Sequence, residues 1–253
     1  MMNNKNANRG LLRLLVFAFI VLLAGIGLYA ANYYSLLPHR TYTAEDFGIA
    51  TVYSEVDYNN NGIDDYTDIL FGAKKDAENR PTYDGAYYSG GYPPDDIGVC
   101  TDVVWRAFKN AGFNLREMLN NDIIARPESY PDIEQRDKNI DFRRVGNLRV
   151  FFDEYALSLS MDITHIEEWQ PGDIVIFGDD KHIGIVSDKR NSMGQPYIIH
   201  NYGQPNREQD FLKHSQVTGH YRFDASMIPE DIIVKWSDGD DSAPGTVSVV
   251  HLN

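Results

Sequence analysis

The chain has 253 residues, 43% hydrophobic and 24% charged, which is long enough for one large globular domain and excludes a disordered chain. Its formal net charge of -14 argues against nucleic acid as a partner, because phosphate binding requires clustered Lys and Arg. An acidic surface is compatible with calcium, and we expect no organic cofactor.

The N-terminal segment, residues 1–35, is expected to hold a cytoplasmic n-region and a signal anchor. Lys5, Arg9 and Arg13 precede an uncharged apolar run over residues 14–31. A spanning helix needs roughly 17 to 25 residues, and basic charge before the run predicts that everything after it lies outside the cytoplasm. We therefore expect a single-pass cell-membrane protein with an extracytoplasmic C-terminal domain.

The same segment is open to two further interpretations. The small residues at the end of the run, Ala30 and Ala31, also permit signal cleavage and a secreted protein. A buried core helix is also conceivable, but basic residues at only one end of the run argue against it.

The remainder of the chain divides into three parts. Residues 36–52 are expected to be a linker, residues 53–236 one α+β domain, and residues 237–253 a C-terminal tail. Within the tail, the apolar residues 247–250 are expected to be an edge strand or frayed.

A polar loop at residues 57–68 predicts a structural calcium site. Oxygen-bearing side chains stand at loop positions 1, 3, 5, 9 and 12, and Gly62 at position 6 permits the sharp turn that brings them together. The alternative is a polar Asn-Gly turn without a metal. The expected ligands, with a main-chain oxygen at position 7, are Asp57, Asn59, Asn61, Ile63, Asp65 and Asp68.

The sole cysteine, Cys100, is predicted to be a nucleophile. Apolar residues recur at helical spacing between residues 99 and 111, and Gly112 follows where a helix often ends, so Cys100 lies in the first turn of a helix. A helix N-terminus and a nearby imidazole both lower the pKa of a thiol. The alternative is a small buried hydrophobic residue.

A charged section, residues 114–149, is expected to be a helical insertion with a loop. It contains the adjacent pair Arg143 and Arg144. We expect this pair to join a surface ion-pair network with Asp137, Asp141 and Glu154, and contact with a carboxylate-bearing substrate is the alternative.

Three short β-branched segments, residues 173–177, 182–187 and 197–200, predict consecutive antiparallel strands. His182 opens the second strand and His200 ends the third, so the two rings can meet, with His182 as general base and His200 fixing its tautomer. Asn201 is the alternative for the orienting role. The remaining histidines are expected to be solvated or structural, although His220 can still line a cleft.

The motifs that carry this arrangement resemble those of the bacterial domain of unknown function 1287 family, over nearly all of residues 53–225. They resemble, more distantly, the NlpC-type peptidoglycan peptidases, whose fold is papain-like. The motifs, in chain order, are Gly98-Val99-Cys100-Thr101-Asp102-Val103-Val104-Trp105, Gln170-Pro171-Gly172-Asp173-Ile174-Val175, His182-Ile183-Gly184-Ile185-Val186 and Ile198-Ile199-His200-Asn201.

The resemblance to the peptidases implies a Cys100–His182–His200 triad on an N-terminal helix packed against an antiparallel sheet. A Tyr-x-x-Gly-Gly segment matches at Tyr87, and we expect Tyr87, Asp102 and Asn201 at the substrate cleft. The chain departs from the peptidases where Thr101-Asp102 replaces the usual Ser-Gly, and an inward Asp102 opposes thiolate formation. As a first-turn carboxylate, Asp102 is instead favoured by the helix dipole.

These features predict an extracytoplasmic cysteine peptidase or amidase that cleaves an amide bond, with a cell-wall peptide or glycopeptide of peptidoglycan as substrate. An acyltransferase uses the same residues and is not separable by sequence. The same residues are also compatible with a non-catalytic, calcium-stabilised wall-binding module, or with a zinc site at the Cys-His-His set.

Overall fold

The computed structural model describes residues 3–38 and 40–240, and the chain forms two compact units that divide at residue 39. The division lies within the predicted linker. The predicted tail strand at residues 247–250 lies outside the described residues.

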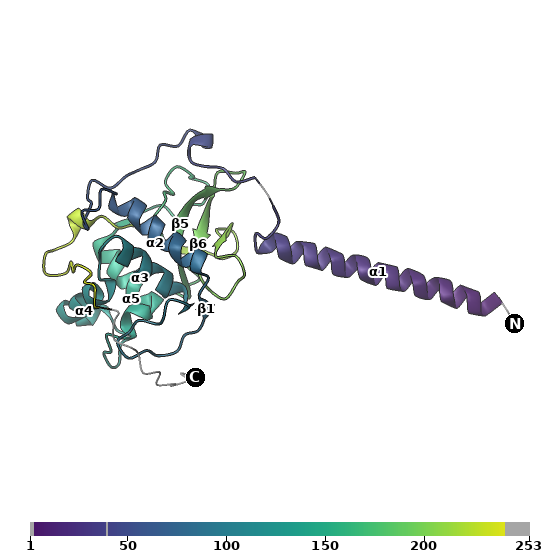
Figure 1. Ribbon diagram of the computed structural model, residues 1–253, viewed down its shortest axis with the longest axis horizontal. Coiled ribbons are helices and arrows are strands. Elements are labelled where there is room, and N and C mark those ends of the chain that lie inside the picture. The colour runs from purple at the N-terminus through teal and green to yellow at the C-terminus, as the bar shows by residue number, and fades with distance from the viewer. Residues whose placement is uncertain (1–2, 39, 241–253) are drawn as a thin grey trace. The chain divides into compact units, whose positions relative to one another are not determined.

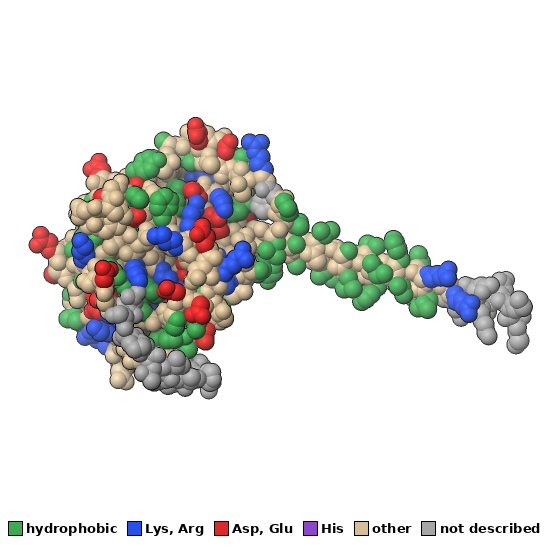
Figure 2. Space-filling view, viewed as in Figure 1, with side chains coloured by type: hydrophobic (Ala, Val, Ile, Leu, Met, Phe, Trp, Pro, Cys, Tyr) green, Lys and Arg blue, Asp and Glu red, His purple; other side chains and the backbone are tan. Residues whose placement is uncertain are grey.

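The first unit is one helix, α1 (Asn3–Tyr33). Within its segment Arg9–Tyr33, a stretch of 18 residues has a mean hydropathy of 2.7, and Figure 2 shows apolar side chains along the helix. By length and composition this helix can cross a membrane. Its leucines and phenylalanines are exposed, which is not what a core helix of a folded domain shows.

The second unit contains four helices among its described residues: α2 (Asp65–Asn79), α3 (Cys100–Asn110), α4 (Leu115–Ala125) and α5 (Val145–Tyr155). The helix predicted between residues 99 and 111 is α3. Helices α2 and α3 pack so closely that a Cβ at Gly72 would lie 2.7 Å from the Ala107 Cα. The predicted insertion supplies α4, the first residues of α5 and two single-turn helices, Pro127–Ser129 and Asp141–Arg143.

Six strands form one antiparallel sheet: β3 (Leu157–Ser158), β4 (Ile174–Phe177), β5 (His182–Arg190), β6 (Pro196–Ile199), β7 (Glu208–Gln209) and β8 (Val217–Arg222). Their order in the sheet is β3-β8-β4-β5-β6-β7. The three predicted strands are confirmed as neighbours β4, β5 and β6, whereas β8 was not predicted. A parallel pair, β1 (Thr82–Tyr83) and β2 (Ile97–Gly98), forms a separate small sheet.

The helices gather on one side of the sheet, with α2 and α3 beside β5 (Figure 1). Side chains alternate along β4, so Ile174 and Ile176 join the helices in one core cluster while Val175 and Phe177 join a second cluster around Trp169. The domain is therefore a mixed helix and sheet fold in which α3 lies against β5, the strand that His182 opens.

Candidate active site

Cys100 is the first residue of α3, after Val99 in extended conformation. The side chain is 7% exposed, and the backbone N–H of Ile183 donates a hydrogen bond to its sulfur. Because Ile183 directly follows His182, the thiol lies at the start of β5. The tertiary fold thus brings together the cysteine and the histidine that the sequence paired, 82 positions apart.

The two predicted histidines are hydrogen-bonded to each other. His182 Nε2 lies 2.7 Å from His200 Nδ1, with His182 at the start of β5 and His200 directly after β6. The close approach depends on Gly184, where a Cβ would lie 2.8 Å from the Ile199 carbonyl oxygen and 3.1 Å from the His200 Cβ. With Nε2 engaged, Nδ1 of His182 is left as the nitrogen to accept a proton.

The side chain of His200 is fully buried, and Phe211 and Tyr202 pack around it at ring centroid distances of 4.3 and 5.2 Å. Because these two rings pack against it, the His200 imidazole is held in one orientation. The predicted meeting of the two rings is present, and the role of His200 in fixing the tautomer of His182 stays a prediction.

The protonation of the pair differs from the sequence-based expectation. Burial raises the pKa of the Cys100 thiol to about 11, and the charge of Asp102 acts in the same direction. Burial lowers the pKa of His182 to about 4. The helix N-terminus and the Ile183 N–H favour a thiolate, but burial outweighs them. The expected lowering of the thiol pKa is therefore wrong for this state, in which burial favours a neutral thiol and a neutral imidazole.

Alkylation of Cys100 by iodoacetamide is expected to be slow at pH 7 and to rise about tenfold per pH unit from pH 6 to 10 without a plateau. Only the thiolate reacts, and a pKa of about 11 makes its fraction at pH 7 roughly 300-fold smaller than that of an ordinary thiol with a pKa of about 8.5. Mass spectrometry of the full-length protein in detergent measures the rate.

The same profile is expected for His182→Ala, since a neutral imidazole contributes no charge to stabilise the thiolate. A plateau below pH 8 that disappears in His182→Ala would show a preformed thiolate–imidazolium pair and contradict the neutral pair.

A cleft of about 940 Å³ opens beside the thiol. Its lining includes Cys100, Tyr83 and the turn between β4 and β5, residues 179–181. Tyr83 is 49% exposed, and it lines the same cleft as Cys100, whose charge contributes, after burial, to the raised pKa of this tyrosine. The sequence did not single out Tyr83, since it lies outside the Tyr-x-x-Gly-Gly match.

Tyr87, the tyrosine that the motif indicated, does not line this cleft. Its hydroxyl donates to Asp137 at 2.8 Å and accepts from the Asn139 amide at 3.2 Å. Tyr87 thus fastens the insertion to the segment before Cys100.

Asp102 is fully buried and forms a bidentate ion pair with Arg143, at 2.9 Å from Nε and 2.8 Å from Nη2. The same carboxylate accepts hydrogen bonds from the Val99 N–H and the Trp105 indole N–H, both at 2.7 Å. Direct contact with a substrate is therefore the wrong role for Asp102. It fixes the first turn of α3, as the helix-dipole alternative implies.

The predicted surface network of Arg143 and Arg144 is also wrong. Arg143 is buried against Asp102, and its Nη1 donates to the Ala86 carbonyl at 2.9 Å, while Arg144 is exposed at the cleft. Glu154 pairs instead with Arg126. The insertion thus lines one wall of the cleft, and its Arg143 holds the start of α3 in place.

Asn201 is fully buried and donates from its amide to the Gly98 and Pro81 carbonyls, at 2.9 and 3.3 Å. These bonds tie the end of β6 to the segment that leads into Cys100. The Asn201 amide therefore bonds to groups other than His182, and His200 is the side chain that contacts the His182 ring. His220 is likewise structural, with its ring bonded to Asp173 and stacked on Trp169 at 3.8 Å.

Among the described residues, no three side chains of His, Cys, Asp or Glu stand together as a preformed metal centre. This finding removes the support for a zinc site at Cys100, His182 and His200. The loop at residues 57–68 differs from such a centre, because three of its six expected oxygen ligands belong to amides and to the main chain.

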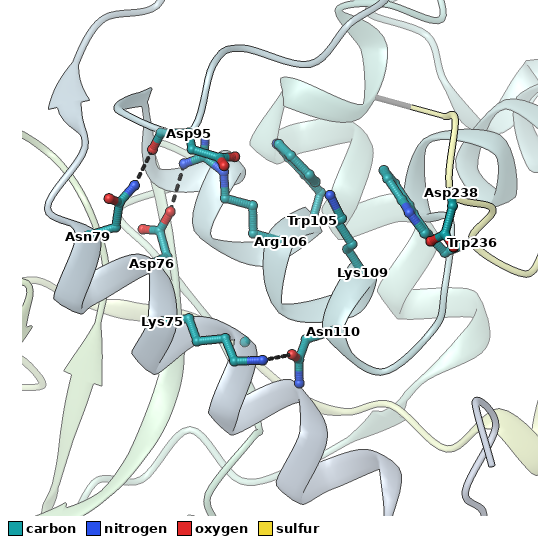
Figure 3. A pocket seen from close by; sticks show the side chains of 11 residues that line it. Lys75, Asp76, Asn79, Asp95, Trp105, Arg106, Lys109, Asn110, Trp236 and Asp238 are labelled. Carbon is teal, nitrogen blue, oxygen red and sulfur yellow. Dashed lines mark hydrogen bonds and ion pairs between the residues drawn. The ribbon is translucent and has the colours of Figure 1, made fainter. Parts of the chain in front are cut away.

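A second hollow of about 540 Å³ lies between α2, α3 and the segment around Trp236 (Figure 3). Several of its polar side chains are paired with one another or with the main chain: Arg106 with Asp76, Lys75 with Asn110, and Asn79 with the Asp95 carbonyl. The stacked rings of Trp105 and Trp236 close one side. Cys100, His182 and His200 do not line this hollow.

The model of the family described as domain of unknown function (DUF1287) matches residues 70–223. The chain belongs to this family. It is also 35% identical over 165 residues, which are 61% of this chain and 80% of the relative, to the uncharacterized protein YijF of Escherichia coli (strain K12). No solved structure gives a significant match. The matched region of this DUF1287 protein contains Cys100, His182 and His200.

Proposed function

We propose that this DUF1287 protein is a cysteine hydrolase with a papain-like fold that cleaves an amide bond. The observation that carries the proposal is the hydrogen-bonded pair of His182 and His200 at the strand start that also contacts the Cys100 sulfur. A buried nucleophile that lines an open cleft, with a base and an orienting group at the neighbouring strand ends, forms the combination that acyl-enzyme chemistry requires.

The neutral thiol and imidazole favour general-base catalysis. As the Cys100 sulfur attacks the amide carbonyl, its proton passes to His182, and the protonated ring then delivers that proton to the departing amine. Water attacks the thioester with His182 as base, and the thiol leaves re-protonated. The N–H groups of Cys100 and Thr101 at the helix N-terminus contact the sulfur, and we assign them as the donors that stabilise the oxyanion.

A cell-wall peptide or glycopeptide is the substrate class that we propose, with the domain outside the cytoplasm and α1 as its membrane anchor. Basic residues before α1 support this orientation. The order of the cysteine, Pro-Gly-Asp and histidine motifs, which resembles that of peptidoglycan peptidases, supports the substrate. A thioester that meets an amine in place of water would make the same protein an acyltransferase.

Incubation of the full-length protein in detergent with purified peptidoglycan is expected to release products with new amino and carboxyl groups, detected by mass spectrometry. Prior alkylation of Cys100 at high pH should stop the release, since the sulfur forms the thioester. EDTA should leave the bond cleavage itself unaffected, because the proposed reaction uses no metal.

Two results would overturn the proposal that the protein is a cysteine hydrolase. Release that continues after complete alkylation would exclude Cys100 as the nucleophile. Retained binding of peptidoglycan with no release under any condition would favour the wall-binding module. A new amide bond to an added amine would identify an acyltransferase.

A further inference from the structure

The loop at residues 57–68 has the backbone form of a helix-flanked calcium loop. Helix α2 begins at Asp65, position 9 of the loop, so Asp68 at position 12 projects from its first turn. Gly62 at position 6 has a φ of +89°, which only glycine adopts freely. Calcium loops need this turn because ligands from both halves must surround one point.

The side chain of Asp65 carries the strongest sign of an unmet interaction. It is 1% exposed, and its Oδ1 accepts from the Tyr58 N–H at 2.8 Å. The other oxygen, Oδ2, is buried without any hydrogen-bond partner. Asp57 and Asp68 both lie close enough to repel its charge. A buried carboxylate oxygen among like charges is costly unless a cation neutralises it.

The other polar side chains of the loop bond to one another and to the loop backbone. The Asn59 and Asn61 amides each donate to Asp68 Oδ2 at 2.8 Å, so two N–H groups stabilise the negative charge of the Asp68 carboxylate. Asp57 accepts from the Asn61 and Gly62 N–H groups at 3.0 and 2.8 Å, which closes the loop. The Asn59 and Asn61 amide oxygens accept from the Asn61 and Ile63 N–H groups at 2.9 and 2.8 Å, so both oxygens are held against the loop backbone.

We propose that this loop binds Ca²⁺ through Asp57, Asn59, Asn61, the Ile63 carbonyl, Asp65 and Asp68. Six oxygen ligands, three of them carboxylates, suit a hard divalent cation that tolerates irregular geometry, whereas Mg²⁺ demands near-ideal octahedral sites. The loop lies outside the region that the family model matches, and the proposal is independent of the proposed hydrolase activity.

Calcium would secure the helix that carries the thiol, because the loop is fastened to the C-terminal end of α3. The Asn59 amide donates to the Asn110 carbonyl at 3.0 Å, and the Asn110 amide, seen in Figure 3, donates to the Asp68 carbonyl at 2.8 Å. A Cβ at Gly112 would lie 2.7 Å from the Asn59 Cβ. The Tyr58 ring stacks on Phe113 at 4.4 Å.

The test measures thermal unfolding of the EDTA-treated full-length protein in detergent, with CaCl₂ or MgCl₂ added at constant ionic strength. With a dissociation constant on the order of 0.1 to 1 mM, 10 mM Ca²⁺ is expected to raise the unfolding midpoint by about 3 °C or more. Mg²⁺ should raise it by less than half as much. Titration calorimetry with CaCl₂ gives the stoichiometry, expected to be one.

Asp65→Asn removes the unpartnered carboxylate oxygen and is expected to abolish the Ca²⁺ shift while the protein stays folded. Asp64→Asn is the matched control, since it removes the same charge from the loop's non-ligand position 8 and keeps a side chain that caps α2 through Thr67. Its Ca²⁺ shift should equal that of the native protein. No shift in the native protein, or equal loss in both variants, would overturn the site.

Discussion

Cys100→Ala and His182→Ala are each expected to lower the turnover of peptidoglycan by about 10⁴-fold or more, and the double variant is expected to be no slower than either single one. The reason is that thiol and imidazole act as one unit. Without the base the thiol keeps its proton, since burial raises its pKa to about 11, and without the thiol the base has nothing to activate.

His165→Ala is the matched control for this loss. His165 is 55% exposed and takes no part in the triad, so its variant should keep native turnover. Initial rates of amine release, with unfolding midpoints measured alongside, separate lost chemistry from lost folding. If His182→Ala kept more than a tenth of the native rate, another group would have to accept the proton and the assignment of the base would fail.

The elements that position the triad were predictable because their signals are local. Helix α3 follows from apolar spacing that ends at Gly112, and strands β4, β5 and β6 follow from β-branched runs between turn residues. Consecutive antiparallel strands have neighbouring ends, which is why His182 and His200 were expected to meet. Strand β8 was missed because Gly219 and His220 weaken its local pattern, and its pairing with β4 is long-range.

The chemistry around the triad was less predictable because it depends on distant residues. The first turn of a helix suggested a lowered thiol pKa, but burial of the thiol reverses the direction. The motif indicated Tyr87, whereas the parallel pairing of β1 with β2 places Tyr83 opposite Gly98, two residues before the thiol. Neither burial nor this register has a signature in a single sequence.

The partner of Asp102 was also hidden, because Arg143 is 41 positions away in a segment that looked like a solvated insertion. In the structure, Arg143 is the counter-ion of Asp102, which lies in the first turn of the helix that begins at Cys100. The chain departs from the peptidase pattern both at Asp102 and by the insertion that contains Arg143. The two departures are linked, because Asp102 and Arg143 form one buried ion pair.

Arg143→Ala is expected to destabilise the domain by about 3–5 kcal/mol, because it leaves the fully buried Asp102 carboxylate without its counter-charge. For a domain of this size the unfolding midpoint should fall by about 10 °C. Fluorescence of Trp105, whose indole N–H donates to Asp102, reports the change at the site during thermal unfolding in detergent.

The neighbouring variant Arg144→Ala supplies the control, since it removes an exposed arginine and should change stability by about 0.5 kcal/mol or less. Combining Arg143→Met with Asp102→Asn should recover part of the lost stability, because neither charge of the buried ion pair then remains. The recovery should be partial, because the Val99 and Trp105 N–H groups, which donate to both carboxylate oxygens of Asp102, find only one oxygen on the amide. Equal midpoints for Arg143→Ala and Arg144→Ala would mean that the buried ion pair does not hold α3, and the fixed start of the catalytic helix would need another cause.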